Sequence, residues 1–150
     1  MEQNHLSDTA FESLGLHESL HTGLREAGFE QCMPIQAAAL PIALEGRDVA
    51  GQAQTGTGKS AAFLLATMHW LMSRPVAADK KGPWAIILAP TRELALQIHK
   101  DAERLGWFTG MDFACIYGGT RYESQRKALE RGTDVLIGTP GRIIVFFKQG

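Results

Sequence analysis

The feature that most constrains the fold is the glycine-rich stretch from Ala53 to Ser60, which reads Ala-Gln-Thr-Gly-Thr-Gly-Lys-Ser. A β-rich run, Asp48–Gln52, precedes it, and an apolar helical stretch, Ala61–Met72, follows it. A strand, a glycine loop and a helix in this order are the setting that a phosphate-binding P-loop requires. Glycines let backbone N–H groups converge on phosphate oxygens, and the amino end of the helix adds a partial positive charge. The sequence therefore predicts nucleotide binding at this loop.

The residues of the loop have separate predicted roles. We expect Lys59 to neutralise the β- and γ-phosphates and Ser60 to place its hydroxyl on Mg²⁺, which makes these two the predicted catalytic residues. The strict pattern has Gly where this chain has Ala53, and the structural alternative is a plain glycine-rich turn. The predicted nucleotide contacts within the loop are Gln54, Thr55, Gly56, Thr57, Gly58, Lys59 and Ser60.

Three more β-rich runs alternate with helical patterns, at Trp84–Ala89, Asp112–Tyr117 and Asp134–Gly138. This alternation predicts an α/β fold with a mostly parallel sheet flanked by helices. The run Ala85–Ala89 is apolar at consecutive positions, which predicts a central strand covered on both faces.

Glycines, prolines and helix-capping residues predict where helices and loops lie. Apolar stripes predict one helix that stops at Gly28 and another that ends near Gly106. Thr120-x-x-Glu123 is typical of a capping box that opens a polar helix, which Gly132 closes. The segment Ser73–Pro83, with two prolines and a glycine, predicts a surface loop.

Composition limits the possible partners. The 150 residues are 45% hydrophobic and 21% charged, as in one soluble globular domain, and the apolar stretch is too short to span a membrane. The formal net charge of -1 excludes a bulk polycationic field, so any nucleic-acid binding must be local. Two distant cysteines and the lack of a signal-peptide pattern predict a reducing, cytoplasmic location.

One motif points to different chemistry. His17-Glu18-x-x-His21 matches the zinc-binding pattern of metalloproteases, in which helical spacing places both imidazoles on one face. The apolar stripe of that helix is already used for packing, and no nearby His or Glu stands out as a third zinc ligand. We therefore prefer a solvated helix face and keep the zinc metalloprotease as the less favoured alternative.

The P-loop is accompanied by residues that together resemble the DEAD-box family of ATP-dependent RNA helicases, over nearly the whole chain. Gly28 to Gln36 resembles the Q motif, Ala53–Ser60 motif I, Pro90–Ala95 motif Ia, Gly118-Gly119 the GG motif, and Thr139–Arg142 motif Ib. Motif I of this family begins with Ala, which accounts for the departure at the P-loop. The stretches 46–54 and 97–99 are most similar to bacterial members that work with the RNA-degradation machinery.

The resemblance implies ATP and Mg²⁺ as cofactors and assigns residues to the recognition of the adenine base. The Gln36 carboxamide can hydrogen-bond N6 and N7 of adenine, a pairing worth about 1–3 kcal/mol against the wrong base. Phe29, together with the upstream Phe11, is the predicted aromatic contact, and core packing is the alternative for both. The family usually has Thr where this chain has Met33, so a hydroxyl is lost near the P-loop.

The resemblance also implies an RNA site at the carboxyl ends of the strands. Hydroxyls, glycine amides and two guanidiniums suit phosphates and 2′-OH groups and do not read bases, so the RNA binding would be independent of sequence. The predicted RNA contacts are Thr91, Arg92, Gly118, Gly119, Thr139, Gly141 and Arg142.

The Asp-Glu-Ala-Asp motif that completes the ATPase site in this family has no counterpart here, because the chain has no Asp-Glu dipeptide. We expect residues 1–150 to be the N-terminal part of a RecA-like domain, truncated before the strand that carries this motif and without the second RecA-like domain. Such a chain would be inactive alone, and its incomplete sheet edge would favour self-association, with the oligomeric state left open. A non-catalytic nucleotide- or RNA-binding fragment is the main alternative.

Overall fold

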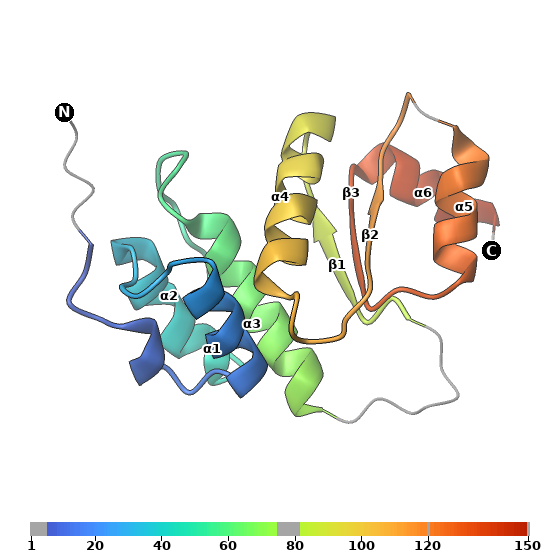
Figure 1. Cartoon of the computed structure of the whole chain (residues 1–150). Coiled ribbons are helices and arrows are strands. Elements are labelled where there is room, and N and C mark those ends of the chain that lie inside the picture. Colours follow the sequence, from blue (N-terminus) through green and yellow to red (C-terminus); the bar gives the residue numbers. More distant parts are fainter. Residues whose placement is uncertain (1–5, 75–81, 120, 150) are drawn as a thin grey trace. The chain divides into compact units, whose positions relative to one another are not determined.

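The structure is a computed structural model that describes residues 6–74, 82–119 and 121–149. Its residues fall into two compact units. The helical unit comprises residues up to Pro75 and the segment Arg104–Thr109, and the sheet unit comprises Val76–Glu103 and Gly110–Gly150. Figure 1 labels the helices and strands of both.

The helical unit contains a short 3-10 helix and three α-helices. These are η1 (Phe11–Ser13), α1 (Glu18–Glu26), α2 (Pro34–Leu44) and α3 (Lys59–Ser73). Helix α3 confirms the helix predicted after the P-loop, and the positive φ of +77° at Gly28 confirms the stop predicted after α1. Helices α2 and α3 pack together, and the indole N–H of Trp70 donates to the carbonyl of Ala43 at 2.9 Å.

The sheet unit is built on three parallel strands in the order β1-β3-β2. In chain order its elements are β1 (Ala85–Leu88), α4 (Arg92–Leu105, whose last two residues belong to the helical unit), β2 (Phe113–Ile116), α5 (Tyr122–Glu130), β3 (Val135–Gly138) and α6 (Pro140–Gln149). Figure 1 shows α4 on one side of the sheet and α5 and α6 on the other. This arrangement confirms the predicted parallel sheet flanked by helices.

Apolar side chains explain why α5 and α6 cover their face of the sheet. Ala114, Ile116 and Leu136 form a buried cluster, and half-buried apolar side chains of α5 and α6 pack against it. All four residues of β3 are buried, as expected of a strand with neighbours on both sides.

The prediction of a central strand at Ala85–Ala89 is wrong within the described residues, because β3 lies in the middle and β1 pairs with β3 alone. Ile86 and Leu88 expose 55% and 59% of their surface. Consecutive apolar residues therefore mark a strand here without showing how many neighbours it has.

The strand predicted at Asp48–Gln52 is also wrong, since these residues form no regular structure. All five are exposed, and no backbone hydrogen bond joins them to another described residue. A β-strand needs a hydrogen-bonding neighbour, and these five residues form no backbone hydrogen bond within the described part of the chain.

Some predictions fall partly outside the described residues. Thr120, the first residue of the predicted capping box, is among these, although Gly132 closes α5 with φ of +93° as expected. Residues 75–81 of the predicted loop Ser73–Pro83 are also outside the described part, and Ser73 itself ends α3. No helix in the described part of the chain is long and apolar enough to cross a membrane.

Candidate nucleotide and RNA sites

The glycine-rich loop enters helix α3 through two glycines with left-handed backbone. Gly56 has φ of +80° and Gly58 has φ of +84°, which side-chain-bearing residues rarely adopt. Within the described part of the chain, no residue accepts a hydrogen bond from the backbone N–H groups of residues 55–58. These donors lie at the amino end of a helix of 15 residues. The loop therefore fits the oxygen atoms of a phosphate group.

The Lys59 side chain folds back onto this loop. Its ammonium group donates hydrogen bonds to the carbonyls of Ala53 and Gln54. The Thr57 hydroxyl also donates to the Gln54 carbonyl, at 2.7 Å. An ammonium group has three N–H donors, so one donor remains for a nucleotide phosphate while the other two contact these carbonyls.

Gln36 connects the predicted base site to the loop. Its side chain is buried, with 4% of the residue exposed. The Oε1 atom accepts from the Met33 backbone N–H at 2.8 Å, and the Nε2 atom donates to the Gly58 carbonyl at 3.1 Å. A carboxamide has two lone pairs and two N–H bonds, so one acceptor and one donor position remain for adenine. The Met33 contact uses the backbone, which the missing threonine hydroxyl does not affect.

The two predicted aromatic contacts differ in exposure. Phe11 is 2% exposed, and its backbone N–H donates to the Glu30 carbonyl at 2.9 Å, which fits the packing alternative. Phe29 is 40% exposed, and the Arg104 guanidinium carbon lies 5.4 Å from the centre of its ring. Of the two rings, Phe29 presents the surface on which a base could stack.

Ser60 lies in the first turn of α3 and is half-buried, next to the residue that would hold the phosphates. The described residues contain no group of three or more His, Cys, Asp and Glu side chains that could hold a metal ion. A hydroxyl is suited to Mg²⁺ when phosphate oxygens and water complete the coordination, so Ser60 stays the predicted ligand.

The residues of the zinc-like motif have other partners. His17 is the N-cap of α1 and accepts from the Ser19 backbone N–H at 3.3 Å. A nitrogen of the buried His21 ring lies 3.1 Å from the Leu14 carbonyl, and Glu18 pairs with Arg25 at 2.8 Å. That ion pair lowers the pKa of Glu18. The structure therefore explains all three motif residues as parts of a packed and capped helix.

In the sheet unit, the carboxyl ends of the parallel strands meet at one edge, where all seven predicted RNA residues follow them. Thr91 comes after β1, Gly118 and Gly119 after β2, and Thr139 to Arg142 after β3. Backbone hydrogen bonds extend the pairing to this edge, since the Ala89 N–H donates to Gly138 and the Thr139 N–H to Ile116. A Cβ built on Gly119 would lie 4.0 Å from Nη1 of Arg92, which places motif Ia beside the GG motif.

Neither predicted arginine forms an ion pair with the described acidic residues. The Arg92 guanidinium lies over the ring of Tyr117 at 4.8 Å, in a cation–π contact. Nη1 of Arg142 lies 3.5 Å from Oε1 of Gln125. Both charges are therefore available to phosphates. Thr91 has a structural role as well, since its hydroxyl oxygen accepts from the Leu94 backbone N–H at 3.2 Å and caps α4.

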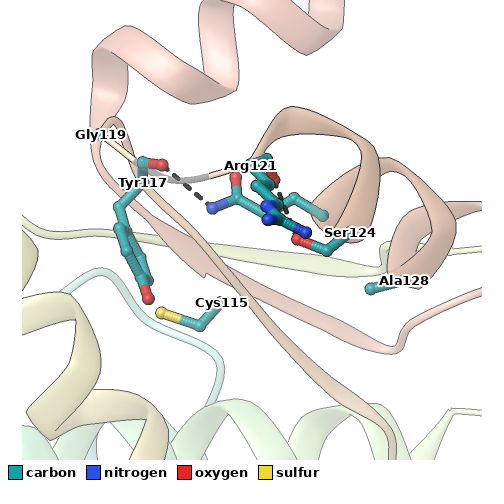
Figure 2. A pocket seen from close by; sticks show the side chains of 7 residues that line it. Cys115, Tyr117, Gly119, Arg121, Ser124 and Ala128 are labelled. Carbon is teal, nitrogen blue, oxygen red and sulfur yellow. Dashed lines mark hydrogen bonds between the residues drawn. The ribbon is translucent and has the colours of Figure 1, made fainter.

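An open hollow of about 890 Å³ lies beside the GG motif, between the end of β2 and helix α5 (Figure 2). Its lining residues are Cys115, Tyr117, Gly119, Arg121, Ser124, Gln125 and Ala128. Except for Gly119, none of these residues was predicted as a site residue, because they belong to no recognised motif and lie together only in the folded chain. Burial, with a smaller contribution from Glu103, raises the pKa of Cys115 to about 11, so its thiol stays protonated at neutral pH.

The chain is similar to known helicases. A protein-family model described as DEAD/DEAH box helicase matches residues 33–150. The chain is 56% identical over 151 residues to the ATP-dependent RNA helicase RhlB of Xanthomonas oryzae pv. oryzae, covering 99% of this chain and 26% of that protein. It is 55% identical over 152 residues to the protein of the same name from Shewanella pealeana, covering 100% of this chain and 35% of that protein. The chain thus spans about a quarter to a third of these relatives.

A solved structure is also similar. The crystal structure of the RNA-helicase Prp28 from Chaetomium thermophilum bound to ADP matches with a TM-score of 0.85 and 38% sequence identity. The match covers 96% of this chain and 35% of that one. This likeness confirms the predicted RecA-like α/β fold.

Proposed function

Because this chain belongs to the DEAD/DEAH box helicase family, we propose that it forms the N-terminal part of the RecA-like ATPase domain of an ATP-dependent RNA helicase. The observation that carries the proposal is the P-loop, whose donors at the start of α3 lie beside a lysine and a serine. The sequence similarity to RNA helicases, over nearly the whole chain, supports the choice of substrate.

In this proposal the helical unit binds ATP. The N–H groups of residues 55–58 hold phosphate oxygens, Lys59 neutralises the β- and γ-phosphates, and Ser60 contributes a ligand to Mg²⁺. Bound Mg²⁺ supplies charge neutralisation for the transfer of the γ-phosphate. Gln36 distinguishes adenine from guanine with its remaining donor and acceptor, and Phe29 offers a stacking surface.

In the same proposal, the sheet unit contacts the sugar-phosphate backbone of RNA. Two guanidiniums, the glycine N–H groups of the GG motif and the hydroxyls of Thr91 and Thr139 are suited to phosphates and 2′-OH groups. Such contacts do not depend on base sequence, so the parent helicase would act on short duplexes of any sequence. ATP binding would clamp the RNA and separate the strands, and hydrolysis would release it.

Two further parts of the proposal concern the cell. The similarity of stretches 46–54 and 97–99 to members that work with the RNA-degradation machinery supports that machinery as a partner. The two cysteines, Cys32 and Cys115, are free thiols, which supports a reducing compartment such as the cytoplasm.

Calorimetric titration with ADP and GDP in the presence of Mg²⁺ tests the nucleotide site. We expect Lys59→Ala to weaken ADP binding about 10- to 100-fold, because charged hydrogen bonds to phosphate are lost. We expect Gln36→Ala to reduce the preference for ADP over GDP about 5- to 100-fold. Gln97→Ala is the matched control, since Gln97 is exposed and its side chain donates to Asp101 in its own helix, at 3.0 Å.

Equal affinities of the unsubstituted protein for ADP and GDP would contradict the role of Gln36, and Lys59→Ala with unchanged affinity would contradict the P-loop assignment. RNA affinity that does not respond to nucleotide would favour the alternative, a non-catalytic binding fragment. The three outcomes are independent of one another, so each part of the proposal is tested separately.

A further inference from the structure

Gln125 on helix α5 connects two segments that follow different strands. Gln125 is 8% exposed, although α5 is otherwise rich in charged, exposed side chains. The Nε2 atom donates to the Tyr117 carbonyl at 3.0 Å, a bond drawn as a dashed line in Figure 2. The Oε1 atom is the partner of Arg142 Nη1 at 3.5 Å. One carboxamide thus contacts the residue before Gly118-Gly119 and the arginine of motif Ib.

The Arg142 side chain also lies near an aromatic pair. Its guanidinium carbon lies 5.8 Å from the ring centre of Tyr122, which stacks on Phe146 of α6 at 4.6 Å. None of the ion pairs found in the described ranges includes Arg142. Among the described residues, Gln125 is a hydrogen-bond partner of this guanidinium.

The hydrogen bond to the Tyr117 carbonyl links Gln125 to the other predicted RNA arginine, Arg92. Tyr117 precedes the GG motif, and its ring lies under the guanidinium of Arg92 at 4.8 Å. A hydrogen bond that fixes the Tyr117 carbonyl also fixes the start of the turn at Gly118 and the base of the ring that supports Arg92. Gln125 thereby contacts the supports of both predicted RNA arginines.

We propose that Gln125 is a positioning residue for RNA binding. It holds Arg142 and the Tyr117–Gly118 backbone at positions from which they contact neighbouring phosphates of the RNA. The proposal rests on the proposed function, because it assumes that Arg92 and Arg142 contact RNA. Gln125 is uncharged and largely buried, so it offers phosphates no charge of its own. In this proposal it affects RNA binding through the groups that it holds.

The test is RNA binding by the full-length protein with Gln125→Met, a substitution that keeps the length of the side chain and removes both hydrogen bonds. The probe is a fluorescein-labelled oligouridylate, measured by fluorescence anisotropy with Mg²⁺ and a non-hydrolysable ATP analogue. We expect about threefold to tenfold weaker binding, the size of one or two net hydrogen bonds. The slope of log Kd against log salt, from about 50 to 200 mM, should fall by up to about 0.7, as for one lost phosphate contact.

A double-mutant cycle with Arg142→Ala distinguishes positioning from general destabilisation. If Gln125 acts through Arg142, Gln125→Met adds little further loss in the Arg142→Ala background, and ADP affinity without RNA is unchanged. Gln97→Met, on exposed Gln97 of the same unit, is the control and should bind RNA like the unsubstituted protein. Gln125→Ala, which favours helix formation, replaces Gln125→Met if that variant does not fold.

The outcomes separate the inference from the function on which it rests. Full additivity of the two losses, or an unchanged salt slope in Gln125→Met, would overturn the positioning role while Arg142→Ala still weakened binding. Unchanged RNA binding in both Arg92→Ala and Arg142→Ala would instead overturn the RNA site, and the role of Gln125 with it.

Discussion

Replacing Gly58 by alanine tests the contact between the P-loop and the Q motif. Gly58 has φ of +84°, which costs a residue with a side chain roughly 1–2 kcal/mol. A Cβ there would also lie 2.3 Å from Nε2 of Gln36, too close for any real contact. The Gln36 carboxamide must then move and lose its bond to the Gly58 carbonyl, which adds about 1 kcal/mol. We expect Gly58→Ala to lower the free energy of unfolding by about 2–3 kcal/mol.

Gly56→Ala is the matched control for this prediction. Its φ of +80° is nearly the same, but a Cβ at Gly56 has nothing within 4 Å. Gly56→Ala should therefore lose only the backbone cost of about 1–2 kcal/mol. The measurement is urea unfolding of both variants, with ADP titration to report whether the loop still binds nucleotide.

The combination of Gly58→Ala with Gln36→Ala completes the experiment, because the shorter side chain at position 36 removes the collision. The double variant should then lose less stability than the sum of its single variants. Equal losses for Gly58→Ala and Gly56→Ala, together with strict additivity in the double variant, would refute the reasoning that Gln36 occupies this space.

Three further outcomes follow from single residues. Burial, helped by nearby His17, lowers the pKa of His69, so the unfolded chain binds more protons than the folded chain as the pH falls, and the free energy of unfolding should decrease below about pH 6.5. Urea unfolding at several pH values should show a weaker pH dependence in His69→Asn. The thiol of Cys115, with its pKa near 11, should react with iodoacetamide at pH 7.5 far more slowly than a free cysteine, and an equal rate would contradict its burial. Thr91→Ala should destabilise the sheet unit by about 1 kcal/mol through loss of the α4 cap, whereas Thr91→Ser should retain most of the stability.

Local sequence signals predicted most elements but missed those that depend on distant partners. Left-handed glycines such as Gly28 and Gly132 ended helices where they were expected, because the conformational freedom of glycine acts locally. Helix α2 was not predicted, since its residues are apolar on all sides and it contains Pro41, which usually interrupts a helix. The predicted strand at Asp48–Gln52 fails for the converse reason, because a strand requires pairing that its own residues do not encode.

The candidate sites divide in the same way. Lys59 and Ser60 were predicted from spacing alone, because the P-loop is a continuous segment. The bond from Gln36 to Gly58 joins residues 22 positions apart, and the bond from Gln125 to Arg142 joins residues 17 apart. Which side chains meet across such distances is decided by helix packing and strand order, so these contacts became visible only in the folded chain.

The Gln36 carboxamide has a thermodynamic consequence for nucleotide recognition. It is bonded to the Met33 N–H on one side and to the loop carbonyl of Gly58 on the other. If adenine changes the strength of either bond, it changes the free energy of the loop that holds the phosphates. By linkage, base and phosphate must then alter each other's affinity by the same factor. Adenosine and pyrophosphate, titrated separately and together, would give that coupling as a single number.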